Sequence, residues 1–219
     1  MAGGSIPTHT YTNSGTYTVS LITWDINNCT DTVIKVNHIR INGPVANFSA
    51  TNLAGCAGLT TTFTDLSNTD GQNNIINWRW HFGDGTIQDF SSPPFEHTYN
   101  NPGVFSVKLV ITDASGCKDS IQQNNLVRTT NPVPNFIASD TLTCPGGTIN
   151  FTNTSVATGF TSQWYFGDGG TSTMTSPSHL YPTNGIYDVK LVIVDNVNCP
   201  DSITKTAYIR VENPIAGFA

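Results

Sequence analysis

The feature that most constrains this chain is an internal repeat of 82 to 88 residues. A His-x-Tyr motif and a cysteine downstream of it each occur three times, and both follow the same two intervals. The histidines are His9, His97 and His179, and the cysteines are Cys29, Cys117 and Cys199. Because unrelated residue types stay in phase over both intervals, the chain consists of repeated structural units.

Each His-x-Tyr motif leads into an alternating apolar pattern. The pattern is Gly-x-Tyr/Phe-x-Val-x-Leu, and it begins at Gly15, Gly103 and Gly185. Successive side chains of a β-strand point to opposite faces, so a period of two predicts a strand with one buried face. Thr, Asn, Ser and Gly recur throughout and only 11% of the residues are charged. This composition favours an all-β fold.

Two further blocks complete the repeat. The block Trp-x-Phe-Gly-Asp-Gly occupies residues 80–85 and 164–169. Its Trp and Phe fall on one face of a strand, and its Gly-Asp-Gly tolerates the positive φ of a tight turn. The third block begins with a proline that opens an expected strand, and it occupies residues 44–48, 134–136 and 214–218. Proline suits the start of an edge strand because its missing N–H is not needed there.

These blocks divide the chain into four parts. We expect the C-terminal half of one repeat at residues 1–42, complete repeats at 43–131 and 132–212, and the first strand of a following repeat at 213–219. The chain is therefore expected to be a piece of a longer array.

Charge and hydropathy exclude two classes of partner. The chain has 9 basic and 15 acidic residues, a net charge of -6, and no basic cluster that could follow a phosphate backbone. This argues against nucleic acid as a partner. No apolar stretch reaches the roughly 18 to 20 residues that cross a bilayer, and the first residues lack the pattern of a signal peptide. We expect no transmembrane segment in this piece.

The five cysteines fall into two sets. Cys56 and Cys144 stand near the front of the complete repeats, whereas Cys117 and Cys199 follow an Asp-x-x-Gly/Asn turn late in them. Pairing within each repeat predicts a disulfide between Cys56 and Cys117 and another between Cys144 and Cys199, with Cys29 unpaired. Each would stabilise its repeat by roughly 4 kcal/mol through loop closure. Reduced cytosolic thiols would leave this periodicity unexplained, so we expect an oxidising, extracellular compartment.

The succession of Trp-x-Phe-Gly-Asp-Gly, His-Thr-Tyr and Gly-x-Tyr-x-Val-x-Leu resembles the PKD (polycystic kidney disease) domain family over nearly the whole chain. The resemblance implies a linear array of immunoglobulin-like, seven-stranded antiparallel β-sandwiches. It also implies a structural role for the motif residues, with Leu180 in place of the usual Thr. The main ones are Trp80, Phe82, Gly83, Asp84, Gly85, His97, Tyr99, Trp164, Phe166, Gly167, Asp168, Gly169, His179 and Tyr181.

The resemblance also implies a function. PKD domains occur in surface proteins and adhesins, and as accessory modules of secreted proteases and polysaccharide-degrading enzymes. Repeats of this low-charge, cysteine-bearing type resemble those of giant surface proteins of gliding or type IX-secreting Bacteroidota. We therefore expect a non-catalytic, disulfide-bonded stalk of a cell-surface adhesin connected with gliding motility. The alternative is a substrate-binding accessory module of a secreted enzyme.

The expected partners are the neighbouring repeats of the same chain, together with polysaccharide or protein ligands at the surface. We expect structural, hydrogen-bonded roles for His97 and His179, because no nucleophile motif accompanies them. Asp84 and Asp168 could bind a structural calcium ion. Without an Asp-x-Asp-x-Asp run beside them, hydrogen bonds within the turn are the favoured interpretation, and we expect no cofactor.

Two surface features remain as candidates. Trp80 and Trp164 are equivalent and are expected in the core, whereas Trp24 and Trp78 lack counterparts and are expected at the surface, where rings can stack on sugars. An Asp-Ser/Thr-aliphatic pattern resembles the O-glycosylation sites of Bacteroidota secreted proteins, although ordinary strand alternation explains it equally well. The hydroxyl residues are Thr32, Ser120, Thr141 and Ser202.

Overall fold

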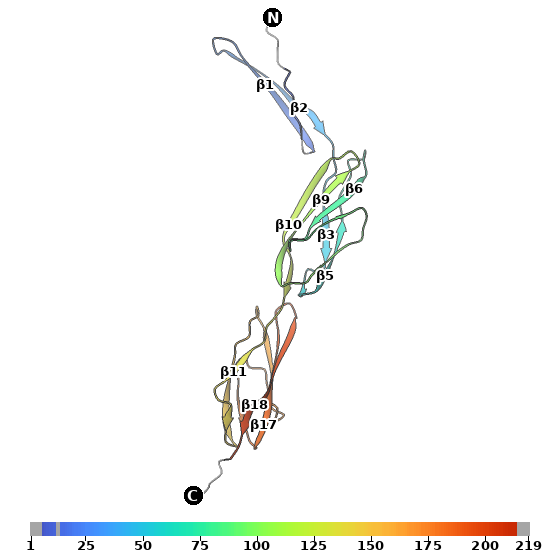
Figure 1. Ribbon diagram of the computed structural model, residues 1–219. Helices are drawn as coiled ribbons and strands as arrows, with labels where there is room; N and C mark the ends of the chain where they lie inside the picture. The colour runs from blue at the N-terminus through green and yellow to red at the C-terminus, as the bar shows by residue number, and fades with distance from the viewer. Residues whose placement is uncertain (1–5, 12–13, 214–219) are drawn as a thin grey trace. The chain divides into compact units, whose positions relative to one another are not determined.

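A computed structural model describes residues 6–11 and 14–213 of the chain (Figure 1). All the regular elements among these residues are β-strands, and none of the described segments is a helix able to cross a membrane. The chain forms two compact units. The first comprises Met1–Leu53, Thr60–Thr98 and Val104–Val127, and the second comprises Ala54–Leu59, Tyr99–Gly103 and Arg128–Ala219. Three short segments from the 43–131 repeat therefore belong to the unit that contains residues 132–212.

The first unit begins with a long β-hairpin. Strand β1 (Gly15–Trp24) pairs antiparallel with β2 (Thr30–Ile41), from Gly15 opposite Ile41 to Trp24 opposite Thr30. Val19 and Leu21 of β1 are 38% and 58% accessible, whereas Leu109 and Leu191, the equivalents of Leu21, are fully buried. This hairpin has no second sheet packed on it among the described residues.

A β-sandwich of eight strands follows the hairpin, with two sheets. The smaller sheet has the order β3-β5-β8. Its strands are β3 (Phe48–Thr51), β5 (Leu59–Asp65) and β8 (Phe95–Tyr99). The larger sheet has the order β4-β10-β9-β6-β7. Its strands are β4 (Ala54–Cys56), β6 (Ile75–His81), β7 (Ile87–Phe90), β9 (Gly103–Asp113) and β10 (Lys118–Thr130).

Residues 132–212 form a second sandwich with the same topology. The smaller sheet has the order β11-β13-β16 and the larger the order β12-β18-β17-β14-β15. The smaller sheet contains β11 (Phe136–Ala138), β13 (Gly147–Asn153) and β16 (Ser178–Tyr181). The larger sheet contains β12 (Leu142–Thr143), β14 (Thr161–Tyr165), β15 (Thr171–Ser172), β17 (Gly185–Val194) and β18 (Pro200–Val211).

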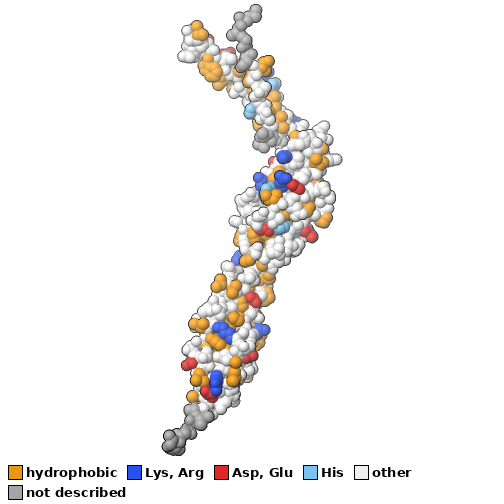
Figure 2. Space-filling model, in the orientation of Figure 1, with side chains coloured by type: hydrophobic (Ala, Val, Ile, Leu, Met, Phe, Trp, Pro, Cys, Tyr) orange, Lys and Arg blue, Asp and Glu red, His pale blue; other side chains and the backbone are white. Residues whose placement is uncertain are grey.

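Each sandwich is filled by one tryptophan and the aromatic and aliphatic residues around it. Trp164 is fully buried between Phe136 and Phe151, with ring centroids 5.1 and 5.6 Å away. Trp80 has the same place between Phe48 and Phe63, at 5.0 and 4.9 Å. The prediction that both tryptophans lie in the core is confirmed. The surface outside these cores is mostly uncharged, as the visible face in Figure 2 shows.

The predicted immunoglobulin-like sandwich is confirmed, with one difference in its strands. The first strand of each repeat is divided between the two sheets, so there are eight strands instead of seven. The chain leaves the smaller sheet at Thr51, turns at Asn52 with a positive φ of 58°, and joins the larger sheet as β4. There β4 lies parallel to β10, with Cys56 opposite Thr130. The sheet is therefore mixed and not purely antiparallel.

Candidate functional site

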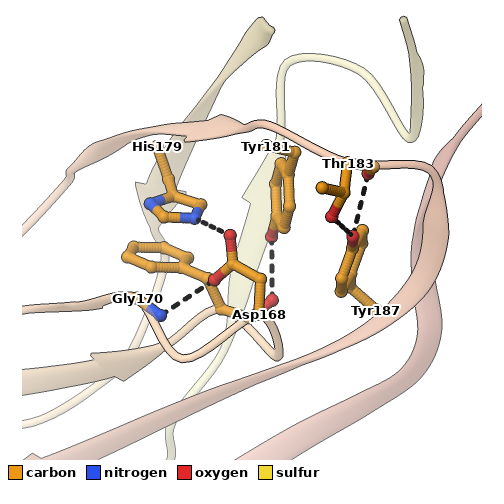
Figure 3. A network of polar contacts seen from close by, with 7 residues as sticks. Asp168, Gly170, His179, Tyr181, Thr183 and Tyr187 are labelled. Atoms are coloured by element: carbon orange, nitrogen blue, oxygen red, sulfur yellow. Dashed lines mark hydrogen bonds and ion pairs between the residues drawn. The ribbon is translucent and has the colours of Figure 1, made fainter. Parts of the chain in front are cut away.

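A polar cluster lies at the Gly-Asp-Gly turn of each repeat, and Figure 3 shows the one in the second repeat. In the second sandwich this turn joins β14 to β15. Asp168 Oδ1 accepts a hydrogen bond from the Gly170 backbone N–H at 2.9 Å, which closes the turn. Asp168 Oδ2 accepts from Nε2 of His179 on β16 at 2.8 Å. One carboxylate thus ties a turn of the larger sheet to a strand of the smaller sheet.

Aromatic rings enclose this carboxylate. The His179 ring stacks on Phe166 with centroids 4.0 Å apart and planes 7° from parallel. Tyr181 OH donates to the Phe166 carbonyl at 3.1 Å, and its ring packs beside Tyr187 at 4.9 Å. Burial and the charge of Asp168 raise the pKa of Tyr181, so its hydroxyl remains a donor at neutral pH. Both carboxylate oxygens of Asp168 and the Tyr181 hydroxyl therefore have partners within the repeat.

The first sandwich contains the same arrangement. Asp84 Oδ1 accepts from the Thr86 N–H at 2.9 Å, and Oδ2 accepts from His97 Nε2 at 2.7 Å. His97 stacks on Phe82 at 4.0 Å. The turn hydrogen bonds favoured from the sequence are thus present in both repeats. No group of three or more His, Cys, Asp or Glu side chains converges anywhere in the part of the chain that the structure describes.

The structure contains one disulfide, and it is not one of the predicted pairs. Cys56 is bonded to Cys199, 143 residues away, with their Cα atoms 5.3 Å apart. Both cysteines belong to the second compact unit. Cys29, Cys117 and Cys144 are free. The predicted bonds from Cys56 to Cys117 and from Cys144 to Cys199 are therefore wrong for this structure.

Strand geometry explains why the predicted pairs cannot form. Cys56 lies opposite Thr130 at the end of β10, whereas Cys117 directly precedes the start of this 13-residue strand. At about 3.3 Å per residue, the two ends of such a strand are roughly 40 Å apart. Cys144 and Cys199 stand at opposite ends of β18 in the same way. A disulfide requires Cα atoms within about 7 Å.

The aspartate of the Asp-x-x-Gly/Asn motif anchors the turn that carries the late cysteine, a role that the sequence analysis did not assign to it. Asp195 Oδ1 accepts from the backbone N–H groups of Val197 and Cys199, at 3.0 and 2.9 Å. Asp113 and Asp25 hold the cysteines of their own turns in the same way. The three aspartates follow the repeat intervals, so the sequence did contain the signal.

Comparison with known proteins decides the family. The sequence profile described as "PKD domain" matches residues 42–128 and again residues 129–211. The chain belongs to the PKD domain family.

Relatives of this PKD chain include two proteins of Vibrio. The "Pre-pro-metalloprotease PrtV" of Vibrio cholerae serotype O1 is 27% identical over 141 residues, which are 63% of this chain and 15% of that protein. The "Microbial collagenase" of Vibrio alginolyticus is 35% identical over 65 residues, 30% of this chain and 8% of that protein. The chain thus spans only a small part of either relative.

Solved structures similar to this chain include two PKD domains of Vibrio proteins. The PKD1 domain of the Vibrio cholerae metalloprotease PrtV is 31% identical and covers 40% of this chain and 99% of that one, with a TM-score of 0.33. The PKD1 domain of Vibrio anguillarum Epp is 24% identical and covers 41% of this chain and all of that one, with a TM-score of 0.34.

The unmatched tryptophans of these PKD repeats differ in exposure. Trp24 is 68% accessible, as expected. Trp78 was expected at the surface, but it is partly buried, because its Nε1 donates to Asp65 at 2.7 Å and its ring lies 5.6 Å from Phe95. In the second repeat Ser162 and Asn153 replace this pair and bond to each other at 3.1 Å. Trp78 is therefore one half of a local polar pair.

The four hydroxyl residues of the Asp-Ser/Thr-aliphatic pattern are all exposed. In three of the four copies the aspartate accepts a hydrogen bond from the backbone N–H of the hydroxyl residue, as Asp201 does from Ser202 at 2.7 Å. These contacts leave the hydroxyl groups directed to other partners or to solvent. Glycosylation at these positions stays a prediction. The predicted strand at 213–219 lies, from Pro214 onward, outside the described residues.

The Asp–His pairs predict a loss of stability in acid. Burial raises the pKa of Asp168, but the hydrogen bonds from His179 and Gly170 outweigh it, so the pKa lies below the ordinary 3.8. A lowered carboxyl pKa contributes stability above the unfolded value, and this contribution is lost as pH falls below about 4. We expect Asp168→Asn to flatten the decline of the urea midpoint between pH 6 and pH 3. An unchanged slope would contradict the role of this carboxylate.

The glycines of the PKD turn predict a second, position-specific effect. Gly167 has φ +89°, and a Cβ there would lie 2.6 Å from the Asp188 carbonyl oxygen. Gly169 has φ +94° but open space around it. We expect Gly169→Ala to cost about 1 to 2 kcal/mol from φ alone, and Gly167→Ala to cost more because the backbone must also move. Urea denaturation of both variants tests this order, and equal losses would show that the contact with Asp188 is unimportant.

Proposed function

We propose that this chain is a non-catalytic structural spacer of an exported protein, built from consecutive PKD repeats that a disulfide holds together. The bond between Cys56 and Cys199 carries the proposal, because it joins a residue of the 43–131 repeat to a residue of the 132–212 repeat. A second covalent link of this kind limits how far the two repeats can separate when one of them opens. This property suits a mechanical role, in which the chain stays extended and resists opening, better than it suits enzymatic catalysis.

The compartment follows from the same bond. Disulfides persist in oxidising compartments and are rare in the reducing cytosol. The spacer therefore acts outside the cytoplasm. The low charge and the scattered polar residues of its surface suit such a place. A narrower form of this proposal is that the spacer is attached to a cell surface. It would then be the adhesin stalk connected with gliding motility that we expected from the sequence. The Vibrio relatives give that form no support.

The interior of the cluster at the Gly-Asp-Gly turn supports a non-catalytic role. Both oxygens of Asp168 accept hydrogen bonds, and His179 is stacked on Phe166. The side chains of Asp168 and His179 are only 11% and 17% accessible. A general base needs access to its substrate, and these groups are committed to each other. The pair fastens the two sheets.

A second candidate is an accessory module that helps a secreted protease to hold its substrate. The observation in its favour is the similarity to a metalloprotease and a collagenase. Exposed rings would provide the contact, and Trp24 and Tyr165 are 68% and 45% accessible. Aromatic rings at the surface suit both sugar and protein ligands.

Sedimentation with insoluble fibrillar collagen, cellulose and chitin separates the two candidates. A spacer gives no saturable co-sedimentation with any of them. Saturable binding that is lost in Trp24→Ala or Tyr165→Ala would establish the accessory module and overturn the spacer. Ile186→Ala is the matched control, because it removes a 65% accessible apolar side chain that carries no ring.

A further inference from the structure

The free cysteines occupy the same positions in the repeat as the bonded pair. Cys144 is the equivalent of Cys56, 88 residues later, and Cys117 is the equivalent of Cys199, 82 residues earlier. Both are free within this chain. Their surroundings show whether they share the geometry of the bonded cysteines as well as the position.

Cys144 is placed as Cys56 is. It follows β12, whose Thr143 lies opposite Val211 of β18, just as Cys56 lies opposite Thr130 of β10. The loop after each cysteine is held by the same contact, because Gly146 N–H donates to Tyr181 O at 2.7 Å and Gly58 N–H donates to Tyr99 O at 2.7 Å. Cys144 is exposed at the end of its sheet.

Cys117 is placed as Cys199 is. The carboxylate of Asp113 holds the Cys117 N–H at 2.9 Å, as Asp195 holds that of Cys199 at 2.9 Å. Within the first compact unit, residues 41–43 lie against this turn, and a Cβ on Gly43 would be 3.6 Å from the Cβ of Cys117.

The segment beside Cys117 is itself informative. Residues 42 and 43 are the equivalents of Thr130 and Asn131, and Thr130 lies opposite Cys56, the partner of Cys199. A cavity of about 300 Å³ lies next to Cys117, lined by Ile41, Asn42, Gly43 and the residues of the turn. Cys117 thus adjoins the end of the preceding repeat at the place where Cys199 meets its partner.

We propose that the disulfides of this protein run from each repeat to the next, each joining the front cysteine of one repeat to the late-turn cysteine of the repeat that follows. Cys144 then bonds the late-turn cysteine of a following repeat, and Cys117 bonds the front cysteine of a preceding one. Cys29 is a late-turn cysteine of the same kind. This proposal deepens the proposed function and rests on it, because it requires an array of repeats.

The chemistry of each bond is a two-electron oxidation. Two thiols lose two protons and two electrons and form one S–S bond, while a disulfide donor accepts them and is cleaved to two thiols. Glutathione disulfide serves as that donor in the test tube.

An elongated chain tests the rule directly. In this chain residues 1–212 are followed by residues 43–219, so a 43–131 repeat follows the 132–212 repeat. Cys29→Ser and Cys117→Ser are placed in the first copy and Cys144→Ser in the second. This leaves two pairs of Cys56 and Cys199, together with one Cys144 that precedes one Cys117. We expect a linked peptide containing Cys144 and Cys117 after refolding with glutathione disulfide.

The matched control is the ordinary chain with Cys29→Ser, which has the same two thiols in the opposite order. Both should be fully alkylated in its monomer. A Lys or Arg lies between every two consecutive cysteines, so trypsin places each cysteine in its own peptide and mass spectrometry identifies the pairs. Full alkylation of Cys144 and Cys117 in an elongated chain whose two other disulfides have formed would overturn the proposal.

A second measurement does not depend on refolding an altered chain. Non-reducing peptide mapping of the parent protein from its native source should show Cys144 linked to a peptide from outside these 219 residues. A link from Cys144 to Cys199, or a free Cys144, would contradict the proposal. The spacer function is judged separately by the sedimentation assay, so failure of one proposal is distinguishable from failure of the other.

Discussion

Replacement of Trp164 by alanine should cost the second sandwich about 3 to 5 kcal/mol, the usual loss when a fully buried aromatic ring is removed from a core. The ring contacts Phe136, Phe151 and Phe166, and its Nε1 donates to the Met174 carbonyl at 2.9 Å. Removal leaves both a cavity and a carbonyl without its donor. Hydrogen exchange in Gly185–Val194, the strand β17 beside Trp164, reports the loss for this sandwich by itself.

The first sandwich supplies the matched comparison. Trp80 is equally buried, but its Nε1 has no hydrogen-bond partner among the described residues. Trp164→Phe should therefore destabilise its sandwich by about 1 to 3 kcal/mol more than Trp80→Phe does, because only the former breaks a hydrogen bond. Equal losses would contradict the importance of the Met174 contact. Trp24→Ala at the exposed position should have little effect.

The sequence was sufficient to predict the sandwich and its core, for a physical reason. Trp80 and Trp164 keep their place in the two complete repeats because each of these repeats must fill the same space between two sheets. Local contacts within the Gly-Asp-Gly turn were equally predictable, since Asp84 and Asp168 bond to N–H groups two residues away. Hydrogen bonds between residues two apart and the alternation of side chains along a strand can both be read from the sequence.

The disulfide pairing could not be predicted from periodicity. A repeating sequence specifies which two positions of the repeat are joined, but not whether the two lie in the same repeat or in consecutive ones. Cys117 and Cys199 occupy equivalent positions one repeat apart, so periodicity alone does not say which of them is bonded to Cys56. The length of β10 settles the matter, because its 13 residues separate Cys56 from Cys117. That strand length is a property of the folded sheet.

Trp78 shows the other limit of repeat analysis. A residue without a counterpart was expected at the surface, yet a compensating change elsewhere in the repeat buries it in part. Asp65 accepts its N–H in the first repeat, and Asn153 bonds Ser162 at the equivalent positions of the second. The two positions vary together because they are in contact, and contact between residues of different strands is visible only in the fold.

Loss of the bond between Cys56 and Cys199 should produce the largest effect of any single change. The bond closes a loop with a sequence separation of 143, for which the chain-entropy estimate is about 5 kcal/mol. Cys199→Ser and Cys56→Ser should each lower the urea midpoint by a similar amount, and the double variant should be no worse than either. This equality is expected because both changes remove the same covalent link.

The remaining cysteines make this prediction specific. Cys117→Ser should leave the stability of the chain nearly unchanged, since its thiol is free, although pairing within the repeat would make it as damaging as Cys56→Ser. Cys29→Ser, at an exposed free thiol, controls for the substitution itself. A large loss in Cys117→Ser with none in Cys199→Ser would show that the bond joins residues of one repeat. The opposite result means that a disulfide joins consecutive PKD repeats in addition to the backbone, so that a force applied along the chain passes through the cystine as well as through the linker.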